Sequence, residues 1–126
     1  MTRTLIALLV ALPFFSSAND ICQDLDSTAT KKGISFDNTD NVFKVGGEGR
    51  LQFYSAPDKK CLEKGVFVIP GNSLYAYVEY HGYYSVMYLS DDGDQVTGWV
   101  EKDRLIDMHK GIAPDYNQDA QQKKSN

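Results

Sequence analysis

The side chains best able to do chemistry in this sequence are its two cysteines and two histidines. A hydrolase with a protein nucleophile needs that nucleophile beside a base, and a zinc site needs closely spaced ligands. Cys22 and Cys61 stand far apart along the chain, and neither His81 nor His109 follows at a ligand spacing. The spacing therefore predicts neither a metal site nor a catalytic pair.

Two further motifs resemble ligand-binding loops without completing them. The run Asp91-Asp92-Gly93-Asp94 is similar to the start of a calcium loop, but it lacks the spacing and the distal glutamate of such loops. The glycine-rich run at residues 46–49 lacks the Lys-Ser/Thr that completes a phosphate loop. Both runs predict turns. We therefore expect a protein without enzymatic activity and without a cofactor.

The N-terminus has the pattern of a secretory signal peptide. Arg3 gives the positive start, residues 5–15 are apolar, and Ser16-Ser17-Ala18 supplies small residues for cleavage after Ala18. The alternative is a buried N-terminal helix. The apolar stretch is too short for a permanent membrane anchor, and the residues before Cys22 do not fit a lipoprotein signal. We therefore expect a free periplasmic protein that is not anchored in the membrane.

An exported protein with an even number of cysteines is expected to pair them, because exported compartments are oxidising. The sequence predicts one disulfide, between Cys22 and Cys61. This bond would tie the N-terminal segment to the rest of the chain.

The charge balance narrows the kinds of partner. Removing residues 1–18 takes away Arg3, so 13 basic side chains become 12 against 17 acidic ones, and the net charge of −4 becomes −5. Nucleic acids and anionic membranes need clusters of Lys and Arg, so neither is an expected partner. A cationic protein partner fits this charge, and so does a domain whose charge only keeps it soluble.

The elements that position these residues follow from the hydrophobic pattern. Residues 19–32 can form a short helix with Asn19 or Asp20 as its N-cap and Gly33 as its stop. From Arg50 onward the pattern is strictly that of strands and turns. The predicted divisions of the chain are a signal peptide, an N-terminal segment with a short helix and strands, a β barrel, and a polar, mostly disordered tail: 1–18, 19–49, 50–106 and 107–126. The expected core residues of the barrel are Leu51, Phe53, Val78, Val86, Val100 and Leu105.

Eight tyrosines and one tryptophan are many for 126 residues. Alternation along residues 73–80 places Leu74, Ala76 and Val78 on the core face. Tyr75 and Tyr77 then face outward. Exposed tyrosine is typical of binding surfaces, but residues 19–45 could instead cover the rings of these two tyrosines. The predicted partner-binding residues combine this outer face with Trp99 and the acidic turn: Tyr75, Tyr77, Glu79, Trp99, Asp91, Asp92 and Asp94.

Residues 50–106 resemble the bacterial SH3-like domains of exported cell-envelope proteins. Residues 51–57 match the opening Leu-x-Val-Arg-Ser-Gly/Ala-Pro strand at the Leu, the Ser and the Ala-Pro. Residues 82–86 match the central Gly-Trp hairpin with Tyr83 in place of Trp, and Gly98-Trp99-Val100 with Leu105 matches the closing strand. Tyr54 in place of Arg and the insertion at residues 59–64 depart from the pattern. The resemblance implies a mainly β fold, a small SH3-like antiparallel barrel preceded by a helical and extended segment.

A short exported chain with one SH3-like barrel also resembles periplasmic immunity proteins. Such proteins neutralise peptidoglycan-degrading toxins delivered by type VI secretion. This likeness implies a binding protein that blocks the active site of its cognate cell-wall hydrolase. The alternative is a cell-wall-binding module that recognises peptidoglycan stem peptide. A two-fold homodimer through an uncovered strand edge or the tyrosine face is also open.

Overall fold

Most of the described chain folds into antiparallel strands. The structure is a computed structural model, and it describes residues 18–113. One α-helix, α1 (Ala18–Lys32), comes first, and two short 3-10 turns, η1 (Lys59–Cys61) and η2 (Lys102–Arg104), lie between strands. The strands are β1 (Ile34–Ser35), β2 (Val42–Val45), β3 (Leu51–Tyr54), β4 (Leu62–Val68), β5 (Ser73–Tyr80), β6 (Tyr83–Leu89), β7 (Gln95–Glu101) and β8 (Leu105–Asp107).

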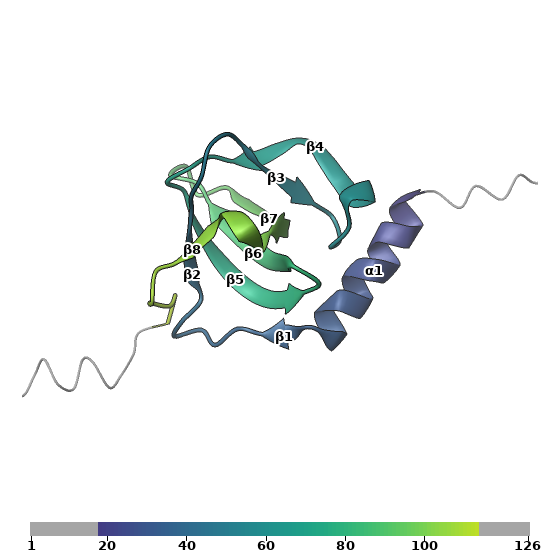
Figure 1. Cartoon of the computed structure of the whole chain (residues 1–126), viewed down its shortest axis with the longest axis horizontal. Coiled ribbons are helices and arrows are strands. Elements are labelled where there is room, and N and C mark those ends of the chain that lie inside the picture. Colours follow the sequence, from purple (N-terminus) through teal and green to yellow (C-terminus); the bar gives the residue numbers. More distant parts are fainter. Residues whose placement is uncertain (1–17, 114–126) are drawn as a thin grey trace, which may run out of the picture.

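The strands make one sheet in the order β4-β3-β7-β6-β5-β2-β8, and β1 pairs separately with β5. Every pairing is antiparallel. Figure 1 shows that the sheet curls round into a half-barrel, with α1 beside it. The predicted mainly β fold, with an antiparallel barrel-like sheet and an N-terminal helix, is confirmed.

The concave side of the sheet holds the main core. Four of the six expected core residues are buried in it, namely Leu51, Phe53, Val86 and Val100. Leu105 is half-buried and packs against the same cluster. Phe36, Phe43 and Tyr84 close one part of this core with edge-to-face ring contacts at centroid distances of 4.8 to 5.5 Å. The core is therefore filled from both the early strands and the β5–β6–β7 meander.

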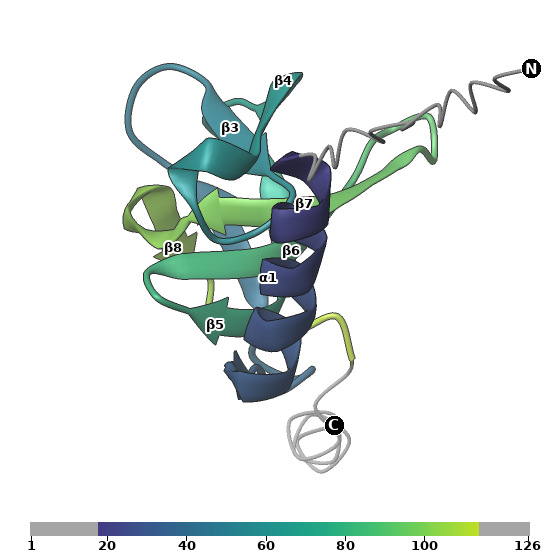
Figure 2. The same ribbon diagram turned by 90° about the vertical axis from the view of Figure 1, so that its right-hand side faces the viewer.

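A second, smaller core lies between α1 and the outer side of the sheet. Ala29 of the helix is buried against Val78 and Trp99, with Tyr54, Tyr80 and Tyr83 around them. Figure 2 shows α1 lying across β5, β6 and β7. The helix reaches the sheet closely at Gly33, where an added Cβ would stand 2.7 Å from the carbonyl oxygen of Glu79. Glycine therefore lets the chain turn from the helix into β1 against β5.

A β-bulge in β5 changes which side of the sheet its last residues face, compared with the prediction. Ala76 is opposite Val86 but Val78 is opposite Ser85, so Tyr77 is an extra residue on its strand. Such an insertion reverses which side the following residues face. Val78 was expected in the barrel core, and it instead belongs to the second core beneath α1. The expected core position of Val78 is therefore wrong, although the residue is buried.

The ends of the sheet differ from the predicted divisions of the chain. Strand β2 was expected in the N-terminal segment, but it pairs with both β5 and β8 and is part of the sheet. Residue 107 ends β8, and residues 108–113 run beside residues 38–42. The expected polar tail therefore does not begin at residue 107, because this stretch is held by backbone bonds such as Val42 N–H to the Lys110 carbonyl (3.0 Å).

The predicted signal peptide lies outside the described residues, apart from Ala18, where α1 begins. Residues 114–126 lie outside them as well. Within residues 18–113, no helix is both long enough and apolar enough to cross a membrane.

Asn41 joins three segments at the end of the sheet. Its side chain is fully buried, donates to the Ala76 carbonyl (3.1 Å) and accepts from the Ile112 N–H (3.0 Å). Its backbone carbonyl also accepts from the Ala76 N–H at 2.8 Å. One amide side chain thus connects the loop before β2, the middle of β5 and the segment after β8.

Asn41→Ala is expected to lower the free energy of unfolding by about 2 kcal/mol, because it leaves two backbone groups without their buried partners. Urea denaturation measures the change. Asn38→Ala is the matched control, since Asn38 is exposed and only its backbone carbonyl, which the substitution keeps, accepts a bond from Ala113. Equal midpoints for the two variants would contradict this role of Asn41.

Candidate partner-binding surface

The part of the outer sheet face that α1 leaves uncovered carries an aromatic and apolar patch. Tyr77 is 39% exposed, and its hydroxyl lies 3.6 Å from the sulfur of Met87. Met87 is opposite Tyr75 in the β5–β6 pairing, and both are half-buried. Leu89, two residues beyond Met87 on the same side of β6, is 45% exposed. We call Tyr75, Tyr77, Met87 and Leu89 the outer patch.

The sequence left open whether residues 19–45 cover Tyr75 and Tyr77. Tyr75 is partly buried and Tyr77 is exposed, so the segment from residue 19 to residue 45 does not cover them both. Met87 and Leu89 were not predicted as site residues. Their alternation with buried Val86 is visible in the sequence and could have identified them.

Glu79, which was predicted beside the tyrosines, does not belong to the outer patch. The bulge at Tyr77 places Glu79 opposite Tyr84, whose ring packs against the main core. Its carboxylate accepts a hydrogen bond from the Lys102 ammonium at 2.9 Å. This hydrogen bond with Glu79 raises the pKa of Lys102. The carboxylate of Glu79 is therefore already paired within the protein.

Trp99, which was also predicted as an exposed partner-binding residue, is only 1% exposed. Alternation does place it on the outer side of the sheet, but α1 covers that part of the sheet. Its indole N–H donates to Oδ1 of Asp26 at 2.7 Å. The aromatic rings of Tyr54 and Tyr83 meet edge-to-face beside it, and burial raises the pKa of both hydroxyls. Trp99 therefore holds the helix and is not a contact residue.

The three predicted aspartates lie in the turn of the β6–β7 hairpin. Figure 2 shows this hairpin projecting away from the rest of the sheet. Ser90 closes the turn, because its N–H donates to the Asp94 carbonyl (2.9 Å) and its hydroxyl accepts from the Asp94 N–H (3.1 Å). Asp91, Asp92 and Asp94 are exposed, and the ion pairs found in residues 18–113 do not include them. The tip of the hairpin thus carries three exposed carboxylates that form no ion pair within residues 18–113.

A polar groove, which the sequence did not predict, runs between α1 and the outer side of β4, β6 and β7, next to the turn that follows β3. Its volume is about 390 Å³, and Trp99 and Gly98 form part of its wall. Its polar lining residues are Asp26, Thr30, Ser55, Glu63, Ser85 and Thr97. A neighbouring hollow of about 310 Å³ shares Asp26 and Ser55 with it. The position of Asp26 on the inner side of the helix follows from its spacing to Cys22 and Ala29.

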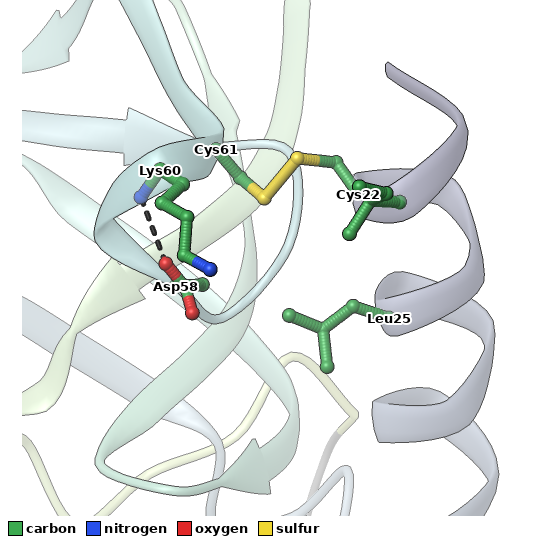
Figure 3. Close-up of a pocket in the computed structure, with 6 residues that line it drawn as sticks. Cys22, Leu25, Asp58, Lys60 and Cys61 are labelled. Carbon is green, nitrogen blue, oxygen red and sulfur yellow. Dashed lines mark hydrogen bonds between the residues drawn. A yellow bond between two sulfur atoms is a disulfide. The ribbon is translucent and has the colours of Figure 1, made fainter. Parts of the chain in front are cut away.

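The predicted disulfide is present and fastens the first turns of α1 to η1. The Cα atoms of Cys22 and Cys61 are 5.8 Å apart. Figure 3 shows this bond beside Leu25. Both cysteines and Leu25 line a small hollow of about 80 Å³. Asp58 begins η1 by accepting the Lys60 N–H at 2.8 Å. Burial of Cys22, Cys61 and Ala56 makes this a third small packed cluster.

Two histidine-containing arrangements are candidates for chemistry, and neither builds a site. His81 stacks on Tyr80 at 3.9 Å in the β5–β6 turn. Ligand atoms of Asp40, Asp107 and His109 lie within 4.8 Å of one another, but all three residues are exposed. Exposed acidic groups often gather in this way without an ion, so we assign no metal site to them.

The chain matches no protein-family model, no curated protein and no solved structure. The motifs shared with bacterial SH3-like domains therefore remain a resemblance, and any function must be argued from the patch, the hairpin and the groove.

Proposed function

We propose that this protein acts in the periplasm as an immunity protein, which binds a peptidoglycan-degrading toxin and blocks its active site. The observation that carries the proposal is the outer patch. Tyr77 stands 39% exposed on the outer face of the sheet, beside Tyr75 and Met87. Tyrosine and methionine are enriched at protein interfaces, where aromatic anchors supply most of the binding energy.

The position of α1 adds to this argument. On one half of the outer face the helix buries Trp99, and three partly buried tyrosines pack around the same cluster: Tyr54, Tyr80 and Tyr83. In the outer patch, Tyr77 and Leu89 are exposed, while Tyr75 and Met87 are half-buried. A partner protein that packed on the patch would cover this half of the outer face, as α1 covers the other half.

The β6–β7 hairpin gives the proposed complex its means of inhibition. A projecting hairpin can enter a substrate cleft and exclude the substrate by its bulk. Asp91, Asp92 and Asp94 at its tip would attract a basic cleft and raise the association rate, an effect that salt screens. The toxin that this argument favours is therefore a cell-wall hydrolase with basic residues around its cleft.

The proposed compartment agrees with the covalent structure. A disulfide that closes the contact between α1 and η1 is expected to form and persist where the environment is oxidising. Export by the predicted signal peptide, with cleavage after Ala18, would deliver the chain to such a compartment and to the site where cell-wall hydrolases act.

The double variant Tyr75→Ala and Tyr77→Ala is expected to bind the toxin at least thirtyfold more weakly, because one lost aromatic anchor commonly costs about 2 kcal/mol. Candidate cell-wall hydrolase toxins are produced in the periplasm with each variant, and lysis is followed together with the dissociation constant of the purified pair. Ile34→Ala is the control, since Ile34 is an exposed apolar residue on β1, outside the patch.

Protection that requires the signal peptide would support action in the periplasm. Unchanged affinity of a folded Tyr75→Ala and Tyr77→Ala variant would contradict the proposed surface. Retention of the protein on purified peptidoglycan, with no hydrolase inhibited, would instead favour the cell-wall-binding alternative.

A further inference from the structure

The polar groove offers hydrogen-bond acceptors and no positive charge. Two carboxylates, from Asp26 on the helix and Glu63 on β4, line it together with several hydroxyl groups. No Lys or Arg is among its lining residues in the described part of the chain. The hydrogen bonds and ion pairs of residues 18–113 leave the carboxylate of Glu63 without a partner. The chemistry of the groove therefore suits a cationic side chain.

One of these carboxylates is held in place. Oδ1 of Asp26 accepts the Trp99 indole N–H at 2.7 Å, and Trp99 is fixed in the second core. This bond orients the carboxylate of Asp26, a lining residue of the groove, and leaves its other oxygen available to a second donor. A guanidinium has several donors in one plane, so it can bond a carboxylate and nearby hydroxyls together better than an ammonium can.

The groove is continuous with the outer patch. Thr97, on the wall of the groove, is opposite Met87, and Met87 is opposite Tyr75, so these residues form one row across β7, β6 and β5. Neighbouring strands are roughly 4.8 Å apart, so the row is about 10 Å long, which is about three residues of an extended chain. A segment lying on the patch therefore reaches the groove within three residues.

We propose that the polar groove receives an arginine side chain of the partner protein, about three residues from an apolar residue that packs on the outer patch. This inference rests on the proposed function, because it names the chemistry that the partner brings. The negative charge of the groove and of the whole chain fits a basic segment.

The chain contains one tryptophan, so the Trp99 indole N–H gives a single side-chain resonance that reports directly on Asp26. The probe is N-acetyl-arginine amide, titrated into the ¹⁵N-labelled protein at constant ionic strength. The expected result is a saturable shift of this resonance. The uncharged analogue N-acetyl-citrulline amide, of nearly the same shape, is expected to leave it unshifted.

Glu63→Gln and Asp26→Asn are each expected to weaken binding of the probe about fivefold, which corresponds to about 1 kcal/mol for a partly exposed charge pair. Asparagine keeps an oxygen for the Trp99 bond, so Asp26→Asn tests charge with little effect on folding. Glu48→Gln is the control, since Glu48 is an exposed acid outside the groove.

An equal shift with citrulline, no shift with arginine, or unchanged binding in both carboxamide variants would overturn the assignment of the groove. Tyr77→Ala should leave the binding of this small probe unaltered, because Tyr77 is not a lining residue. Probe binding without inhibition of any hydrolase would therefore reject the proposed function and keep the groove, whereas inhibition without probe binding would reject the groove alone.

Discussion

Replacing Cys22 and Cys61 with serine is expected to lower the free energy of unfolding by about 4 kcal/mol. The bond joins residues 39 apart in sequence, and closing a loop of this length removes that much entropy from the unfolded chain in the loop-entropy description. The folded state also loses a fixed attachment for the first turns of α1, which otherwise depend on Leu25 and the packed Ala29. Chemical denaturation of the two proteins under oxidising conditions measures the difference.

The unmodified protein in excess reductant is an internal control for this variant. The chain has two cysteines, so a reductant has no other disulfide to break. Reduced protein and the serine variant should therefore unfold at the same denaturant concentration. A serine variant as stable as the oxidised protein would refute the structural role of the bridge.

Val86→Asp is expected to cost at least about 4 kcal/mol and to prevent folding if the domain is only marginally stable. Val86 is fully buried in the main core, between Ala76 on β5 and Gly98 on β7. A carboxylate at this position would lose its hydration without gaining a partner, or it would fold only as the neutral acid. Thermal unfolding followed by circular dichroism measures the loss.

Leu89→Asp is the matched control for Val86→Asp, because it introduces the same group into the same strand at an exposed position. We expect its unfolding to change by less than about 1 kcal/mol, as for most surface substitutions. A melting temperature for Val86→Asp equal to that of Leu89→Asp would refute the assignment of β6 to the core.

The predicted strands are accurate where alternation is regular. Along β7, Val100 faces the core and Trp99 faces the other side, as their spacing predicts. The alternation pattern could not predict the bulge at Tyr77. A single extra residue does not change the sequence pattern of alternating tyrosines and aliphatic residues. All the errors in β5, including the positions of Val78 and Glu79, follow from that one residue.

The cover that α1 gives to the outer face is not evident from the sequence, for a different reason. The sequence predicts a helix over residues 19–32, and the structure has one at Ala18–Lys32. Its buried face is a short stripe of Cys22, Leu25 and Ala29, which is narrower than the face of a core helix. The hydrogen bond between Asp26 and Trp99 connects residues 73 apart, so no local pattern indicates that this helix would cover the tryptophan.

The parts of the candidate site also differ in how far the sequence could predict them. The acidic hairpin tip is local, and the turn at Ser90–Asp94 was predicted from its residues. The polar groove forms where α1 meets β4, β6, β7 and the turn after β3, so only the three-dimensional structure brings its two carboxylates together.

Under the proposed export, in which the chain crosses a membrane with its N-terminus first, the order of the cysteines along the chain matters. Both cysteines precede β4 to β8, so the bridge can close when about half of the domain has emerged. The remaining contacts of α1, with Val78 and Trp99, must await the later strands. An oxidase that acts during translocation would therefore link the helix to η1 before the sheet is complete, and the hairpins would then assemble against a helix that is already tethered.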